Sequence, residues 1–264
     1  MKILVDVIPF DGGKSGISQY ALNVVRALKS AGHDLTLLTE PDVSAKFFPG
    51  CRAIEAPRWT RRAVFSMLWH LFLLPRKIRR TGCDMMLVLA ANRRALRRCP
   101  IPTVGVVHDL SQYHVEAKYD AFRMLYIKRI LPHYVRRMHR IVAISKSTAK
   151  DLMRHWHVPE EKIRIVYNGF TAPTQPKAAS TPSTILYISR LEHPGKNHVG
   201  LIDAYNRLPR AVAEAHPLVL AGGDWNGCEA VHAAAAASPY REHIRLTGFV
   251  PNADLPRLWS EAAV

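Results

Sequence analysis

Two cations in the second half of the chain stand where a diphosphate could bind. Arg190 ends the apolar segment 185–189, and Lys196 follows just before a helical pattern begins. A guanidinium can bind two phosphate oxygens at once and an ammonium acts as a point charge, so together they can neutralise a diphosphate. The alternative, two solvated loop charges, is the commoner situation. The surrounding segment is otherwise almost neutral, and this favours a binding role.

Glycine-rich segments follow two of the apolar runs. Gly12-Gly13-Lys14-Ser15-Gly16 comes after the first run, and Ala221-Gly222-Gly223 ends a later one. Backbone N–H groups at such junctions can contact phosphate, and we expect ligand contact at both. A P-loop is excluded because it needs a glycine where Ile8 stands, and no G-x-G-x-x-G occurs. The first loop could also be a turn that only requires glycine backbone angles.

His108 and Asp109 directly follow the apolar segment 103–107. In open α/β sheets, ligands bind beyond the carboxyl ends of the strands, so this histidine is well placed for a reacting centre. An equally weighted interpretation is a histidine that caps the strand through hydrogen bonds, with Asp109 orienting its ring.

The sequence indicates no metal site. No two aspartates have D-x-D spacing, so a leaving diphosphate would be stabilised by fixed cations and helix dipoles. His155 and His157 form a close pair without an evident third ligand, which favours a surface feature. The cysteines are far apart and lack C-x-x-C spacing, which fits a reducing cytoplasm; they are Cys51, Cys83, Cys99 and Cys228.

Short apolar runs alternate with amphipathic segments along the whole chain, which predicts an α/β fold with doubly wound parallel sheets. The segment 171–183 is rich in Pro, Ser, Thr and Ala and reads as a linker between an N-terminal domain, 1–170, and a second domain, 184–264. The second domain is expected to be incomplete, half of a doubly wound sheet with one bare edge. Strands are expected at 2–8, 35–39, 84–90, 103–107, 141–144, 163–166, 184–189, 217–221 and 243–247. Helices are expected at 17–30, 63–80, 118–138, 146–156, 197–208, 227–238 and 253–260.

The positive charge is confined to the first domain. The formal net charge is +16, of which residues 1–180 carry +17 and residues 181–264 carry −1. The apolar stretch 63–74 is shorter than the roughly 20 residues that span a bilayer. A basic segment containing tryptophans suits docking on anionic lipid, whereas a core helix with solvated arginines at its ends is the alternative, favoured for its apolar face. The residues concerned are Trp59, Arg61, Arg62, Trp69, Arg76, Lys77, Arg79, Arg80, Arg93, Arg94, Arg97 and Arg98.

Several motifs together resemble glycosyltransferase family 4, whose members are retaining, nucleotide-sugar-dependent enzymes of GT-B architecture with two Rossmann-like domains. The most specific is Arg190-Leu-Glu-His-Pro-Gly-Lys-Asn197, preceded by Leu186-Tyr-Ile-Ser189. The others, in chain order and at the family's spacing, are Ser15-Gly-Ile-Ser-Gln-Tyr20, Val107-His-Asp-Leu110, Val166-Tyr-Asn-Gly169, Leu218-Val-Leu-Ala-Gly-Gly223 and Leu246-Thr-Gly-Phe-Val-Pro251.

The resemblance implies transfer of a hexose from a UDP-, GDP- or ADP-sugar to a glycan or lipid-linked acceptor, in polysaccharide or lipopolysaccharide synthesis. It implies no metal and no other cofactor. His108 would lie at the reaction centre, and Gly16 would approach the sugar or the diphosphate. Arg190 and Lys196 would hold the diphosphate. Residues near the nucleotide would be Gly222, Phe249, Val250 and Leu255.

The sequence departs from the family pattern after Leu255–Glu261. Family members continue into another strand and two glutamates separated by seven residues, which contact the donor, and the chain contains neither. A fragment of a longer reading frame is therefore expected, and the rival is a catalytically inactive truncated homologue that acts only as a binding or partner protein. A nucleic-acid partner is not expected, because only the charge suggests it. The expected location is the cytoplasm, with possible peripheral attachment to the inner face of the cell membrane.

Overall fold

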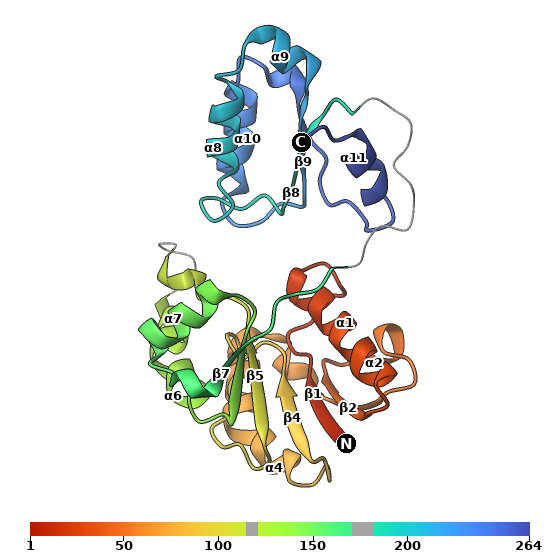
Figure 1. Cartoon of the computed structure of the whole chain (residues 1–264), viewed down its shortest axis with the longest axis vertical. Helices are drawn as coiled ribbons and strands as arrows, with labels where there is room; N and C mark the ends of the chain where they lie inside the picture. The colour runs from red at the N-terminus through yellow and green to blue at the C-terminus, as the bar shows by residue number, and fades with distance from the viewer. Residues whose placement is uncertain (115–120, 171–181) are drawn as a thin grey trace. The chain divides into compact units, whose positions relative to one another are not determined.

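The computed structural model describes residues 1–114, 121–170 and 182–264. The chain divides into two compact units, Met1–Gly169 (unit 1) and Phe170–Val264 (unit 2) (Figure 1). Most of the predicted linker, 171–181, lies outside the described residues. The described part of the chain contains no helix long and apolar enough to cross a membrane.

Unit 1 is built on a seven-stranded sheet in the order β3-β2-β1-β4-β5-β6-β7, and all of its strand pairs are parallel. The strands are β1 (Lys2–Asp6), β2 (Asp34–Thr39), β3 (Arg52–Glu55), β4 (Met85–Val88), β5 (Thr103–Val107), β6 (Arg140–Ala143) and β7 (Ile163–Ile165). The order reverses between β1 and β4, which makes the carboxyl ends of these strands the expected ligand-binding edge. The α/β, doubly wound prediction is confirmed.

Helices cover both faces of this sheet. They are α1 (Gly16–Ser30), α2 (Val43–Phe47), α3 (Ala63–Leu68), α4 (Leu74–Ile78), α5 (Ala121–Leu125), α6 (Leu131–Val135) and α7 (Lys146–Trp156). Successive residues of a strand point to opposite faces. Leu4 of β1 accordingly packs in one core with residues of α3, α4, α6 and α7, whereas Ile3 and Val5 pack in a second core with α1.

The two long helices predicted in unit 1 are each interrupted by a π-helical turn. The turn η2 (Trp69–Leu73) separates α3 from α4, and η4 (Tyr126–Ile130) separates α5 from α6. Each turn immediately precedes a Leu-Pro pair, whose prolines are Pro75 and Pro132. Proline has no N–H to donate to the carbonyl four residues earlier, so the helix widens there instead of continuing regularly.

The short elements β3 and α2 of unit 1 were not expected from the sequence, and neither was α9 (Arg210–Ala215) of unit 2. β3 reads Arg-Ala-Ile-Glu and lies at the sheet edge, where only Ile54 of its four residues is even half-buried. An edge strand with charged ends lacks the apolar run that identifies a buried strand. The remaining short turns of unit 1 are η1 (Arg58–Arg61), η3 (Ser111–Tyr113) and η5 (Glu160–Lys162).

Unit 2 contains a smaller parallel sheet in the order β10-β9-β8. Its elements are β8 (Ile185–Ile188), α8 (His198–Tyr205), α9 (Arg210–Ala215), β9 (Leu218–Ala221), α10 (Cys228–Ala237), η6 (Arg241–His243), β10 (Ile244–Leu246) and α11 (Leu255–Glu261). Its core is formed by β9 with α8 and α10, where Leu218, Leu220, Ile202 and Val231 are completely buried. The second domain is therefore Rossmann-like and shorter than the first.

Of the two ends of the sheet in unit 2, formed by β8 and β10, the one at β8 is covered at the start of that strand. Ala263 donates a backbone hydrogen bond to Thr184 at 2.8 Å, and Leu186 donates to Val264 at 2.8 Å. Ala262 also forms a parallel bridge with Thr184. The residues after α11 thus pair with the outer edge of β8 and occupy backbone groups that would otherwise be open.

Candidate functional site

The loop after β1 is ordered by the carboxylate of Asp11. Its Oδ1 accepts the backbone N–H groups of Lys14 and Ser15, both at 3.0 Å. Partial burial raises the pKa of Asp11, but hydrogen bonds from Ser18, Ser15 and Lys14 outweigh it, and the pKa lies below its usual value. Two of the N–H groups expected to contact a phosphate are therefore already occupied by a carboxylate of the chain itself.

Glycine is required in this loop by its backbone angles. Gly12 and Gly13 have φ of +78° and +85°, which other residues rarely adopt. Gly16, by contrast, is the exposed first residue of α1, and a Cβ there would meet nothing within 4 Å. The turn interpretation explains Gly12 and Gly13, and the predicted ligand contact is left to the open N-terminus of α1 at Gly16.

His108 is held beside this loop at the carboxyl end of β5. It is 8% exposed, its Nε2 lies 2.8 Å from the carbonyl oxygen of Leu89, and its ring meets that of Tyr20 in α1 edge to face. A carbonyl can only accept, so Nε2 carries the proton. Burial lowers the pKa of His108, which leaves a neutral ring whose Nδ1 can accept a hydrogen bond.

Asp109 does not orient the histidine, contrary to one interpretation of the sequence. Its Oδ1 accepts from the backbone N–H and the hydroxyl of Ser111, at 3.1 and 2.5 Å. The carbonyl of Leu89 has the orienting role instead, because β4 and β5 are neighbours in the sheet.

The lowered pKa of His108 predicts that stability depends on pH. Between its folded-state pKa and the unfolded value of 6.5, the unfolded chain binds the extra proton. Stability attributable to His108 is thus complete above pH 6.5 and is lost as the pH falls, by at most about 1.4 kcal/mol per pH unit. Denaturant titrations from pH 7.5 to 5 should show that the free energy of unfolding falls less steeply with pH in His108→Asn than in the unmodified chain. An unchanged slope in that variant would contradict the assignment.

In unit 2, Arg190 is fixed in place by two neighbours just after β8. Its Nε and one terminal nitrogen each lie 2.7 Å from Oε2 of Glu192, whose side chain is 9% exposed. The guanidinium carbon also lies 4.9 Å from the ring centroid of Trp225. Arg190 is therefore not a freely solvated loop charge. Its side chain is 38% exposed, and its guanidinium is held in one orientation.

The segment from Arg190 to Lys196 turns tightly around Glu192. The backbone N–H of Lys196 donates to the carbonyl of Glu192 at 3.2 Å, and the hydroxyl of Tyr187 donates to the carbonyl of Lys196 at 3.0 Å. These two hydrogen bonds anchor the backbone of Lys196, and Lys196 is exposed to solvent. Within the described residues, no acidic side chain lies within ion-pair distance of the Lys196 ammonium.

The packing of the small sheet requires a glycine at position 222. A Cβ at Gly222 would overlap the carbonyl of Ser189 and lie 2.8 Å from Cα of Arg190. Gly222 also bridges Gly248, and a Cβ at Gly223 would be 3.5 Å from Cβ of Phe249.

The other residues predicted to lie near a nucleotide occupy the same unit. Phe249 is 55% exposed and Val250 is half-buried in the loop after β10, while Leu255 is the half-buried first residue of α11. The contacts of Gly222 and Gly223 therefore bring Arg190 and Phe249 to one edge of the small sheet.

A buried polar cluster in unit 1 was missed from the sequence. Asp6 and His70 are almost fully buried, with Oδ2 and Nε2 3.2 Å apart. Nδ1 of His70 donates to the carbonyl of Ser66 at 2.6 Å, and Nε of Arg94 donates to the hydroxyl of Ser66 at 2.9 Å. Burial lowers the pKa of Arg94 to about 10, so it stays charged at neutral pH. The available signal was that Asp6, Ser66 and His70 each interrupt an apolar run.

Two side-chain clusters of the described residues could hold a cation. One consists of His114, Asp151 and His155, and the other of Asp224, Cys228 and His232. The first cluster corrects the expectation that His155 has no further ligand near it, although His157 is not part of it. In both clusters a carboxylate already contacts an imidazole nitrogen. Asp151 lies 2.9 Å from Nε2 of His114, and Asp224 lies 2.9 Å from Nε2 of His232.

Comparison with protein families identifies both halves of the chain. Residues 14–172 match the model of Glycosyltransferase Family 4, and residues 171–264 match Glycosyl transferases group 1. The chain belongs to Glycosyltransferase Family 4. It has the GT-B fold of these glycosyltransferases, with one larger and one shorter Rossmann-like unit.

The chain is similar to transferases named for O-antigen and for lipopolysaccharide. It is 24% identical over 171 residues to O-antigen chain mannosyltransferase B of Escherichia coli, a match that covers 60% of this chain and 45% of that protein. Its fold resembles the lipopolysaccharide outer core galactosyltransferase WaaB, with a TM-score of 0.66 at 15% identity over 99% of this chain and 72% of WaaB. It also resembles S. aureus TarM, solved in complex with UDP, with a TM-score of 0.66 at 9% identity over 99% and 79% of the chains.

Proposed function

We propose that this glycosyltransferase moves a hexose, with retention of configuration, from a nucleoside diphosphate sugar to a glycan or lipid-linked acceptor. The acceptor would belong to lipopolysaccharide or another cell-surface polysaccharide. The relatives that make O-antigen and outer core glycans support this class of acceptor, and the TarM complex with UDP supports a nucleotide donor. The proposal includes a cytoplasmic protein attached peripherally to the inner face of the membrane, in keeping with its basic first domain.

The observation that carries the proposal is the orientation of Arg190. Glu192 holds one side of the guanidinium and Trp225 lies against its face, so its remaining N–H groups are directed without further loss of side-chain entropy. Arg190 would bind the diphosphate, and Lys196 would add a second cation on an anchored backbone. As the glycosidic bond breaks, negative charge grows on the diphosphate and both cations stabilise it.

The chemistry proposed for unit 1 rests on the neutral ring of His108. Nε2 is occupied by Leu89, so Nδ1 is the atom that could accept a hydrogen bond from a sugar hydroxyl. A neutral acceptor positions a hydroxyl without placing positive charge beside the developing oxocarbenium-like centre. Gly16, at the open start of α1, would approach the sugar or the diphosphate.

Isothermal titration with UDP-, GDP- and ADP-hexoses would test the donor proposal directly. We expect one of the three to bind in the micromolar to millimolar range, and product analysis by NMR to show the same anomeric configuration as in the donor. Inversion would overturn retention. Binding without turnover on any acceptor would favour the rival function, a homologue that binds its ligands and does not react.

Removal of metal ions is expected to leave donor turnover unchanged. Arg190 and Lys196 would provide the charge that a divalent metal supplies elsewhere. Turnover should be measured in EDTA and again with added manganese or magnesium. Activity that EDTA abolishes and manganese restores would overturn the metal-free proposal, and the carboxylate of Asp224 would be the first residue to replace.

A further inference from the structure

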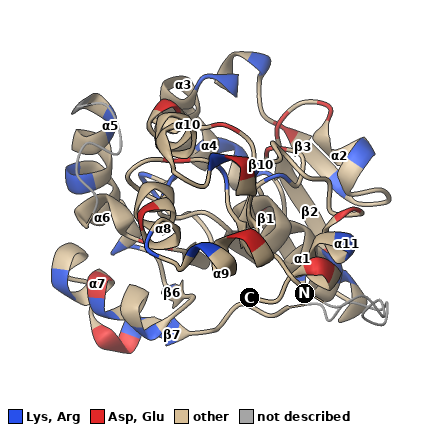
Figure 2. Ribbon diagram, turned by 90° about the horizontal axis from the view of Figure 1, so that it is seen from above, with Lys and Arg blue, Asp and Glu red and all other residues tan. Residues whose placement is uncertain are grey.

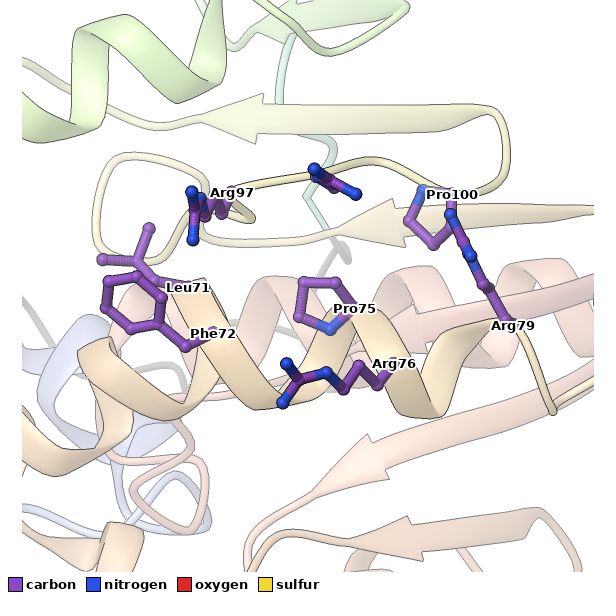
Figure 3. A pocket seen from close by; sticks show the side chains of 8 residues that line it. Leu71, Phe72, Pro75, Arg76, Arg79, Arg97 and Pro100 are labelled. Atoms are coloured by element: carbon purple, nitrogen blue, oxygen red, sulfur yellow. The ribbon is translucent and has the colours of Figure 1, made fainter.

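A pocket of about 290 Å³ lies between the helical segment of η2 and α4 and the loop that precedes β5. Figure 3 shows its two walls, with Arg76 and Arg79 on the helical side and Arg97 and Pro100 on the opposing loop. Its floor is formed by Leu71 and Pro75, both buried, and by the half-exposed Phe72. The eight lining residues are four arginines and four apolar residues, without a carboxylate.

The four arginines of this pocket, Arg76, Arg79, Arg97 and Arg98, are all exposed. Throughout the described residues, none of them has an acidic side chain within ion-pair distance. Arg97 instead lies over the ring of Phe72, 5.8 Å from its centroid. Elsewhere on unit 1, Arg52 and Arg61 are paired with Asp34 and Asp42. The pocket therefore concentrates uncompensated positive charge, which attracts an anion. Figure 2 shows Lys and Arg at further points around unit 1, among them α2, α5 and α7.

A second pocket, of about 310 Å³, shares Leu71 and Phe72 with the first. Most of its lining is apolar or aromatic and includes Val64, Leu68 and Phe122, which are 42%, 43% and 54% exposed. An amphiphile with an anionic head would place its head in the cationic pocket and cover the exposed apolar side chains of the neighbouring pocket. Phe72 stands at the boundary, with its ring shared by the two hollows.

We propose that the two pockets together seat a single anionic phospholipid of the membrane. The four arginines bind its phosphate, and the neighbouring apolar pocket receives the upper part of one acyl chain. Guanidinium groups bind phosphate oxygens in pairs, so arginines suit this head better than lysines would. This inference extends the proposed peripheral attachment by naming a specific lipid site, and it does not depend on donor binding or turnover.

Charge is tested first, with short-chain lipids that stay monomeric in solution. The full chain is titrated with dihexanoyl phosphatidylglycerol, dihexanoyl phosphatidylcholine and inorganic phosphate. We expect saturable 1:1 binding of the phosphatidylglycerol and much weaker binding of the other two. Arg76→Gln with Arg97→Gln should weaken it about tenfold or more, as expected when charged hydrogen bonds are lost. The control, Arg62→Gln with Arg80→Gln, removes equal charge from exposed residues outside the pocket and should stay within about twofold.

The apolar half is tested with two phenylalanines of similar exposure in the same helical segment. Phe72→Ala, at a site 47% exposed, should weaken the short-chain lipid several-fold, and Phe65→Ala, at a site 43% exposed, should not. The site would be overturned if the control variants lost as much lipid affinity as the pocket variants, for the arginines and for the phenylalanines alike. Such a result would show diffuse surface attraction. Phosphate binding as tight as the lipid would show a free-anion site and also overturn the lipid site. Nucleotide binding, measured on the same variants, should be unchanged, which separates this result from the transferase proposal.

Discussion

Gly222→Ala is expected to destabilise unit 2 by about 3 kcal/mol, the cost of forcing extra volume into a closed site. The new Cβ would overlap the carbonyl of Ser189 and press on Cα of Arg190. Both are backbone atoms of the neighbouring strand end, which cannot move without breaking the pairing of β8 with β9. Hydrogen–deuterium exchange of the β9 amides should report the loss without interference from unit 1.

Gly223→Ala is the matched control for this substitution. Its Cβ would meet Cβ of Phe249 at 3.5 Å, which is ordinary van der Waals contact. The change should leave the stability within about 0.5 kcal/mol, or raise it slightly because alanine reduces the entropy of the unfolded chain. Equal exchange rates in the two variants would contradict the close packing of Gly222 against Ser189.

Arg190→Ala is expected to weaken nucleotide binding by about 1.5–3 kcal/mol, the cost of a lost charged hydrogen bond. Calorimetric titration with the nucleoside diphosphate of the preferred donor measures this directly. Arg210→Ala is the control, because Arg210 is also paired with a carboxylate in unit 2, at 2.6 Å from Glu214, and lies outside the proposed site. Unchanged affinity in Arg190→Ala would remove the proposed role of this residue.

Arg190→Ala also leaves the buried carboxylate of Glu192 without a cation. This unpaired charge can destabilise the loop even if Arg190 has no role in binding. Combining Arg190→Ala with Glu192→Gln removes that charge. If the loss of affinity persists in the double variant while unit 2 keeps its thermal stability, the guanidinium acts on the ligand. If the double variant recovers normal affinity, Arg190 serves only to neutralise Glu192.

Most strands and helices were predictable because their apolar residues recur with the spacing that a buried strand or an amphipathic helix requires. The segment 103–107 and the helix 146–156 agree with the structure residue for residue. Buried parallel strands are nearly all apolar, and Ser145 caps α7 by accepting from Thr148. The π-helical turns before Pro75 and Pro132 were missed, because the apolar pattern alone does not show how a helix accommodates a missing donor.

For the candidate site, the sequence predicted the position of each residue at the end of an element more easily than it predicted what each residue contacts. It placed His108 at a strand end, but its orienting partner is Leu89, a residue 19 positions earlier that only the β4–β5 pairing brings near. It placed Lys14 and Ser15 in a glycine loop but did not show that Asp11 occupies their N–H groups. It predicted ligand contact at Gly222 but did not show that the carbonyl of Ser189 leaves no room for a Cβ there.

The sequence by itself determined the α/β alternation, the basic first domain and the family motifs, because periodicity, charge and motif spacing are local properties of the chain. Tertiary structure alone decided that Trp225 lies against the guanidinium of Arg190, that Asp6 meets His70, and that Arg76 faces Arg97 across one pocket. Each of these depends on strand order and helix packing, which bring together segments up to about 64 positions apart. Hydrogen bonds and ion pairs act only over a few ångströms, so their partners become known only when the fold is known.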